Sequence, residues 1–141
     1  MWQLLRRGGK KVRRDRCGTR RGHRLKISKA QELAQRPAAI NDRSEAGHWE
    51  VDLVIGAGQR GVLLVAVERV SLVTRLLCLP SKAAGVVADG LLQILARERV
   101  HSLTYDRGLE WMEHARVGAQ LGAHSYFCLP YHSWEKGTVE N

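Results

Sequence analysis

The sequence lacks the features that would place it in a secreted or membrane class. Its three cysteines, Cys17, Cys78 and Cys128, are odd in number, far apart and in no Cys-x-x-Cys pair, which favours a reducing compartment and argues against a structural zinc site. The longest apolar runs fall well short of the roughly 20 residues that span a bilayer. Charged side chains also follow Met1 too early for a secretory signal. We therefore predict a cytoplasmic protein.

Motifs of common hydrolases and nucleotide-binding enzymes are also missing. The histidines form no His-Glu-x-x-His arrangement, which disfavours a zinc hydrolase. No serine lies in a Gly-x-Ser-x-Gly elbow, and no glycine-rich loop suits a phosphate group. Glu110 and His114 are four residues apart on a predicted helix and could share a metal ion, but a polar pair on the helix surface is the more frequent outcome.

Acidic side chains are scarce in the first 29 residues. This segment holds 12 Lys or Arg against the single acid Asp15, a net charge of +11, whereas residues 30–141 hold 11 basic and 13 acidic side chains, a net charge of −2. A basic, glycine-containing segment with few apolar residues cannot bury enough surface to fold, and it attracts polyanions. Nucleic acid is the expected polyanion, bound in a salt-sensitive way with little sequence preference. A solvated tail without a partner is the alternative.

The length limits the chain to one folded domain and a tail. With 141 residues there is enough sequence for one ordinary apolar core and too little for two. We predict a disordered basic tail at 1–29, a polar connector at 30–46 that contains the helix-breaking Pro37, and a core at 47–141.

Hydrophobic periodicity in the core alternates between that of strands and that of helices. Short turns between the first three strands predict an antiparallel meander. The predicted strands are His48–Ile55, Val62–Val67, Val73–Leu79, His101–Tyr105 and Ala123–Cys128, and the predicted helices are Lys82–Arg99, with Ser81 as N-cap, and Leu109–Leu121, ended by Gly122. A further helix is predicted to start near Gly137.

This order, β-β-β-α-β-α-β, resembles the ribonuclease-H-like fold, an α/β architecture with a mixed five-stranded sheet. The first three strands of that fold pair antiparallel, and the later strands join in parallel through helices. Its first and fourth strands are neighbours. The resemblance therefore predicts that Asp52, on the first strand, and Asp106, at the end of the fourth, come together.

Three carboxylates stand in contexts that suit a shared divalent-metal site. Asp52 interrupts an otherwise apolar strand, where a charge is costly unless it is paired or bound to a metal. Asp106 follows a predicted strand, although Asp-x-Gly is also an ordinary turn sequence, and Glu140 taken alone would be a solvated acid. Hard cations such as Mg²⁺ prefer carboxylate ligands. The set of three therefore predicts phosphodiester chemistry.

Four segments together match a known family. They are His48–Val54 (HWEVDLV), Val67–Ser71 (VERVS), Leu103–Glu110 (LTYDRGLE), and Tyr126–Phe127 through Trp134–Asn141 (WEKGTVEN). These segments are similar to the catalytic core of bacterial insertion-sequence transposases of the IS-thirty family, over about residues 36–141. The basic segment ahead of the core also resembles that of the family.

The resemblance implies a DDE triad made of Asp52, Asp106 and Glu140, because the 33 residues between Asp106 and Glu140 equal the family's spacing. It also implies two bound Mg²⁺ ions, for which Mn²⁺ can substitute, and DNA cleavage at element ends followed by strand transfer. DNA is then the partner, with nucleoid association when bound, and self-association stays open. The residues expected to contact DNA are Arg6, Arg7, Lys10, Lys11, Arg13, Arg14, Arg16, Arg20, Arg21 and Lys136.

The chain departs from the family pattern in ways that weaken the expected activity. The replacements are Val51 for a usual Gly, Leu72 for an Arg, Leu129-Pro130 for an Asp-Pro pair and Val139 for an Asn. Each removes a polar or flexible group near the presumed site, where hydrogen bonds orient metal ligands.

The match also predicts a fragment truncated at both ends. It lacks the family's helix-turn-helix region ahead of the core and leaves Glu140 on about one helical turn, which is unfavourable by a nucleation factor on the order of 10⁻³. We expect weak or absent catalysis by this chain alone. The competing interpretation is a non-catalytic, basic DNA-binding remnant, and an RNA-associated protein is a third.

Overall fold

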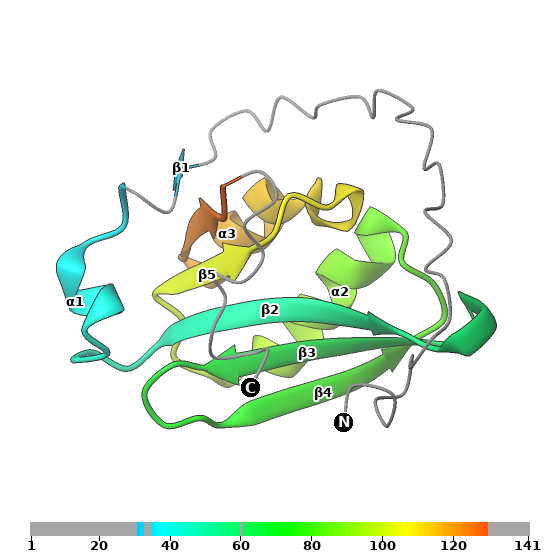
Figure 1. Ribbon diagram of the computed structural model, residues 1–141, viewed down its shortest axis with the longest axis horizontal. Helices are drawn as coiled ribbons and strands as arrows, with labels where there is room; N and C mark the ends of the chain where they lie inside the picture. Colours follow the sequence, from blue (N-terminus) through cyan, green and yellow to red (C-terminus); the bar gives the residue numbers. More distant parts are fainter. Residues whose placement is uncertain (1–30, 33–34, 60, 130–141) are drawn as a thin grey trace, which may run out of the picture.

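Hydrogen-bonded strands form one mixed sheet at the centre of the computed structural model, which describes residues 31–32, 35–59 and 61–129. The strands are β1 (Gln31–Glu32), β2 (His48–Ile55), β3 (Val62–Glu68), β4 (Thr74–Leu79), β5 (Ser102–Tyr105) and β6 (His124–Phe127). The helices are α1 (Ala38–Asn41), α2 (Ala84–Leu95) and α3 (His114–Leu121), with 3₁₀ turns η3 (Ala57–Gln59) and η4 (Leu109–Trp111). Figure 1 shows their arrangement.

The strand order of the sheet is β1-β6-β5-β2-β3-β4. Strands β2, β3 and β4 pair antiparallel, whereas β5 pairs parallel with β2, and β6 pairs parallel with β5. The predicted meander followed by parallel strands is therefore confirmed, as is the pairing of the first and fourth core strands. The two-residue β1, parallel to β6, adds a sixth strand that the sequence did not predict.

Helices α2 and α3 lie on the same face of the sheet (Figure 1). Val51 and Leu103 point into the apolar layer between the sheet and α2, and both are fully buried. Because side chains alternate along a strand, Glu50, Asp52 and Thr104 point to the other side. We call this side, which does not contact α2, the second face.

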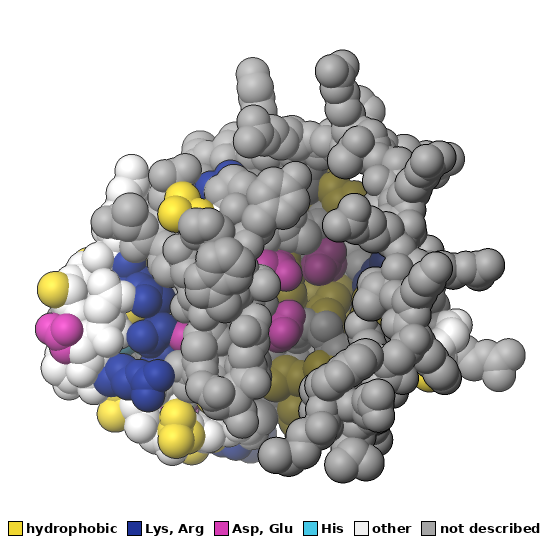
Figure 2. All heavy atoms as spheres, viewed as in Figure 1, with side chains coloured by type: hydrophobic (Ala, Val, Ile, Leu, Met, Phe, Trp, Pro, Cys, Tyr) yellow, Lys and Arg dark blue, Asp and Glu magenta, His cyan; other side chains and the backbone are white. Residues whose placement is uncertain are grey.

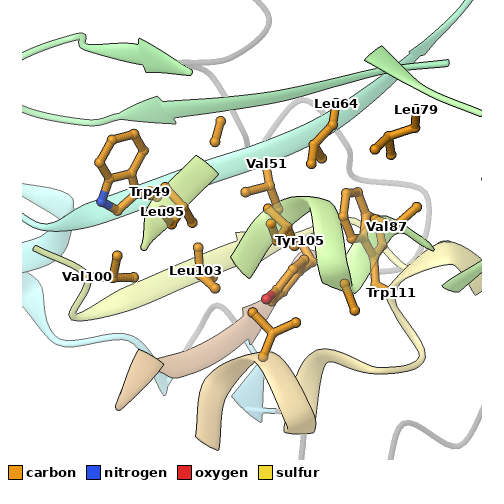
Figure 3. Packing of buried hydrophobic residues seen from close by; sticks show 14 of the residues in the cluster. Trp49, Val51, Leu64, Leu79, Val87, Leu95, Val100, Leu103, Tyr105 and Trp111 are labelled. Atoms are coloured by element: carbon orange, nitrogen blue, oxygen red, sulfur yellow. The ribbon is translucent and has the colours of Figure 1, made fainter. Parts of the chain in front are cut away.

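The apolar layer brings α2 unusually close to the sheet at Gly90. A β-carbon at this position would lie 2.8 Å from Leu79 Cδ2 and 3.2 Å from Leu64 Cδ2. Glycine has no β-carbon and avoids this overlap. Gly90 therefore lets α2 pack closely against β3 and β4, although glycine has a low helix propensity. Figure 3 shows the packed side chains of this layer, including Leu64, Leu79 and Val87.

Helix α2 is shorter than predicted. It begins at Ala84 rather than Lys82, and its N-cap is Ala83, which makes no side-chain capping hydrogen bond. The Ser81 hydroxyl accepts a hydrogen bond from the Ala83 backbone N–H at 3.4 Å. Ser81 therefore closes a local turn that ends directly before the helix, instead of capping it. At the other end the Glu98 N–H bonds to the Leu95 carbonyl in a tight turn, which ends the helix before the predicted Arg99.

The predicted helix Leu109–Leu121 is divided into η4 and α3. Asp106 accepts hydrogen bonds from the Gly108 N–H and the Trp111 indole, which draw the chain into tight 3₁₀ geometry before α3 begins at His114. Gly122 ends α3 in the left-handed conformation, with φ of 66°, as predicted.

The connector differs from its prediction in one respect. Pro37 does not break a helix but precedes the short α1 as its N-cap, a position where the missing backbone N–H of proline costs nothing. The predicted helix near Gly137 and the predicted tail at 1–29 lie outside the described residues.

Two further findings concern the cysteines and the helices of the described ranges. Cys78 is exposed and Cys128 is buried. None of the helices in the described ranges is long and apolar enough to cross a membrane.

Replacing Leu91 with alanine should destabilise the fold by about 2–5 kcal/mol, because a buried leucine in a packed layer leaves a cavity when it is truncated. Leu91 is 1% exposed on α2. Urea denaturation followed by circular dichroism measures the loss. Leu76→Ala is the control, since Leu76 is 56% exposed, and it should change stability by no more than about 0.5 kcal/mol. Equal losses for the two variants would contradict this packing.

Candidate active site

The two predicted aspartates lie on neighbouring parallel strands. Strand β2 pairs with β5 in a register that sets Glu50 opposite Thr104. Asp52 and Asp106 follow these two positions by two residues each, at the same end of the sheet. Neighbouring strands lie about 4.8 Å apart, so the register brings together two acids that are far apart in the sequence.

Local hydrogen bonds restrain both carboxylates. Asp52, which is half-buried, accepts a bond from the Leu53 backbone N–H at 2.9 Å. Asp106, also half-buried, accepts one from the Gly108 N–H at 3.3 Å. The second contact is the Asp-x-Gly turn that the sequence allowed as the ordinary explanation, so at Asp106 the turn and the predicted site occur together.

The chemistry of the two aspartates fits a hard divalent cation, which prefers oxygen ligands and keeps several waters. No set of three or more His, Cys, Asp or Glu side chains suited to a metal ion occurs within the described ranges. Glu140 lies outside those ranges, as do the predicted DNA contacts Arg6, Arg7, Lys10, Lys11, Arg13, Arg14, Arg16, Arg20, Arg21 and Lys136. The triad therefore stays a prediction.

A buried ion pair lies on the second face next to Asp52. Glu50, two residues before Asp52 on the same strand face, is completely buried and pairs with the guanidinium of Arg69, which follows β3. A buried carboxylate is costly unless a partner compensates it. The pair thus ties the turn after β3 to the strand that carries Asp52.

A second arginine joins this cluster from the connector. Arg36 donates to the Thr104 hydroxyl at 3.3 Å and to the Asn41 side-chain carbonyl. Burial, and after it the neighbouring positive charge of Arg69, lowers the pKa of the Arg36 guanidinium. Figure 2 shows Lys and Arg side chains to the left of acidic side chains near the middle of this side of the molecule. Sequence reasoning missed this network, although the alternation of Glu50 and Asp52 was a signal for it.

The turn between β3 and β4 is organised by Glu68. Its carboxylate accepts hydrogen bonds from the backbone N–H groups of Gly47, Val70 and Ser71 and from the Ser71 hydroxyl, at 2.6–3.0 Å. Burial alone would raise the pKa of Glu68, but these hydrogen bonds outweigh it and the pKa is lowered. The VERVS segment therefore has a structural role in addition to its resemblance to a family motif.

The structure describes the positions of Val51 and Leu72, two of the family departures. Val51 directly precedes Asp52, but its side chain points into the apolar layer under α2 and is fully buried. Leu72 lies in the β3–β4 turn, next to the His48 end of β2. That these exchanges remove polar or flexible groups near the site stays a prediction.

The surface polar pair predicted for Glu110 and His114 is also wrong. His114 is buried, and its ring packs edge-on against Phe127 with centroids 4.9 Å apart. Burial lowers the pKa of His114 below its ordinary value. Because α3 starts only at His114, Glu110 and His114 do not share a continuous helix.

No protein-family model matches the chain. It is 40% identical over 135 residues to the transposase for insertion sequence element IS1086 of Cupriavidus metallidurans, covering 94% of this chain. It is 35% identical over 135 residues to the transposase InsI for insertion sequence element IS30C of Escherichia coli, covering 92% of this chain. Over nearly its whole length, the chain is thus similar to a part of insertion-sequence transposases.

The fold of the chain agrees with that similarity. It is similar to the catalytic core domain of BIV integrase, with a TM-score of 0.57 and 26% identity, over 68% of this chain and 63% of that one. The predicted ribonuclease-H-like, integrase-like core is therefore confirmed. The chain spans 39% of the Cupriavidus relative and 35% of the Escherichia coli relative, so it corresponds to part of a transposase of that length.

Replacing Arg69 with methionine should destabilise the chain by about 3–5 kcal/mol, because it removes the guanidinium that pairs with the buried Glu50 carboxylate. Urea denaturation measures the change. The control is Arg75→Met, which breaks the more exposed Arg75–Glu98 pair, 2.7 Å long, and should cost about 0.2–1 kcal/mol. The buried pair would have no special importance if both variants lost the same stability.

Stability should fall as the pH drops below about 6.5, the ordinary histidine pKa. Burial lowers the pKa of His114 in the folded state, so between the folded and unfolded pKa values only the unfolded chain binds the proton, which favours unfolding. His114→Phe keeps an aromatic ring against Phe127 and should flatten this decline by up to about 1.4 kcal/mol per pH unit. The midpoints of urea denaturation between pH 5 and 7.5 measure this decline, and His124→Phe, at an exposed position, is the control. If stability falls with pH as steeply in His114→Phe as in the unmodified chain, His114 is not the cause of the decline.

Proposed function

We propose that this chain is the catalytic portion of a DDE transposase, which cuts and joins DNA strands with divalent cations held by Asp52, Asp106 and Glu140. The observation that supports the proposal is the parallel pairing of β2 with β5, because Asp52 and Asp106 each follow the paired residues Glu50 and Thr104 by two positions. Sequence identity to insertion-sequence transposases supports the reaction class.

Each residue of the proposed site has a distinct task. Asp52 lies on β2, where it pairs with Val65 of β3, and β2 pairs with β5 up to Glu50. Asp106 follows β5, and two N–H groups orient its carboxylate. Both supply the hard oxygen ligands that Mg²⁺ prefers, and Glu140 completes the second site.

The proposed cofactor explains why carboxylates are required. Asp52, Asp106 and Glu140 would hold two Mg²⁺ ions, which would supply activation of the attacking water or 3′-hydroxyl and stabilisation of the leaving oxygen. The contribution of the protein is to keep Asp52 and Asp106 at a fixed separation while DNA binds.

DNA is the proposed partner, and the basic segment 1–29 is its proposed first contact. With a net charge of +11, this segment should bind nucleic acid through counterion release, with an affinity that falls steeply as salt rises. A non-catalytic role limited to this binding is the second candidate, favoured by the confinement of the excess charge to this segment.

One set of variants tests the proposed function. The purified chain is mixed with Mn²⁺ and supercoiled plasmid DNA, and nicking and Mn²⁺ binding are measured separately, the latter by titration calorimetry. Asp52→Asn should abolish nicking and weaken Mn²⁺ binding, because it removes one charged ligand. Asp89→Asn is the control: Asp89 is an exposed acid paired with Arg116, and its replacement should change neither.

The same experiment separates the two candidates. Deleting residues 1–29 should reduce plasmid binding but leave Mn²⁺ binding intact. A chain that binds plasmid through residues 1–29, yet binds Mn²⁺ no better than the Asp52→Asn variant, would be the non-catalytic remnant, and the catalytic proposal would then be abandoned.

A further inference from the structure

The indole of Trp111 contacts one of the two proposed metal ligands. Its Nε1–H donates a hydrogen bond to Oδ1 of Asp106 at 2.5 Å, and the Gly108 N–H reaches the same oxygen at 3.3 Å. Two donors on one oxygen restrict rotation of the carboxylate about its side-chain bonds. The orientation of Asp106 is thus set from η4, which lies outside the sheet.

Packing holds Trp111 firmly in this position. The side chain is 3% exposed, and its ring lies 5.2 Å from the ring of Tyr105, the last residue of β5. Tyr105 in turn stacks on Phe127 at 5.1 Å. Figure 3 shows Trp111 beside Tyr105 and Val87 of α2. The donor therefore has little freedom to leave Asp106.

The chemistry of tryptophan explains why this contact matters. An indole offers one N–H donor and no acceptor, so a buried indole requires a partner. An ionised carboxylate has about four acceptor positions, so N–H donors and a metal ion can bind it together. Phenylalanine would fill much of the same space without the hydrogen bond. Trp111→Phe therefore removes the hydrogen bond to Asp106 while it keeps much of the ring packing.

We propose that Trp111 is a positioning residue that orients the Asp106 carboxylate for divalent-metal binding. This inference rests on the proposed function, since it assumes that Asp106 is a ligand. Trp111 contacts neither DNA nor the reacting atoms in this role, and it acts only through Asp106. Hydrogen-bond partners of metal ligands typically contribute a factor of about 10–100 in metal affinity or activity.

The test is Trp111→Phe, with Mn²⁺ affinity measured by titration calorimetry on the full chain. The variant should bind Mn²⁺ about 10–100-fold more weakly than the unmodified chain. Plasmid nicking should need correspondingly more Mn²⁺ but regain its rate at saturating Mn²⁺. A loss of general stability alone would not produce this split between affinity and saturated rate.

Trp49→Phe is a matched control. Trp49 is 1% exposed, and its Nε1–H donates to the Arg99 carbonyl at 3.0 Å, at the opposite end of β2 from the aspartates. The control loses the same kind of hydrogen bond from the same kind of buried ring. It should keep the Mn²⁺ affinity of the unmodified chain.

A measurement on the unmodified chain covers the case in which Trp111→Phe fails to fold. The indole N–H resonances of ¹⁵N-tryptophan-labelled protein are followed during titration with Mg²⁺. The Trp111 resonance should shift with metal binding, because its acceptor changes charge environment, and the Trp49 resonance should stay unchanged. An unmoved Trp111 resonance during demonstrable Mg²⁺ binding would overturn the inference.

Asp106→Asn distinguishes failure of the inference from failure of the proposed function. If Asp106→Asn weakens Mn²⁺ binding while Trp111→Phe does not, the positioning role is wrong and the proposed function stands. If Asp106→Asn binds Mn²⁺ as well as the unmodified chain, Asp106 is not a ligand, and the proposed function and this inference both fall.

Discussion

Parallel pairing between β2 and β5 sets residues that are 54 positions apart opposite each other, such as His48 and Ser102. Parallel strands cannot be linked by a short turn, so the chain must pass through β3, β4 and α2 before β5 can pair. The packing of α2 against the apolar layer determines the position at which β5 joins the sheet after this crossover. Everything proposed for Asp52 and Asp106 depends on the pairing of β5 with β2, because a different strand order would separate the two acids.

The strands were predictable because their cause is local. Alternating or continuous apolar side chains and short turns specify β2, β3 and β5 almost to the residue, and the family resemblance supplies their order. Helix boundaries were less predictable, since they depend on contacts across the fold. The start of η4 is one example. The Asp106 carboxylate accepts a hydrogen bond from the Trp111 indole, and this contact divides a segment whose periodicity suggests one helix.

The candidate site was predictable in its acids but not in their surroundings. Residue type, spacing and the family resemblance are enough to propose Asp52 and Asp106 without any structure. The partners of Glu50 could not be deduced in that way, because Arg69 and Arg36 reach it from a turn and from the connector. Such partners depend on strand register, which a single sequence specifies only after the fold is known.

The contact between Arg36 and Thr104 makes the connector part of the folded body. Arg36 is nearly as buried as the apolar interior, and its guanidinium lies beside the Glu50–Arg69 pair. A shortened chain starting at Gly47 would lack Arg36, and water would then reach both the Thr104 hydroxyl and the Glu50–Arg69 pair. Strands β2 and β5, which carry Glu50 and Thr104, should then be less stable, so the smallest autonomous unit of this core begins before its first long strand.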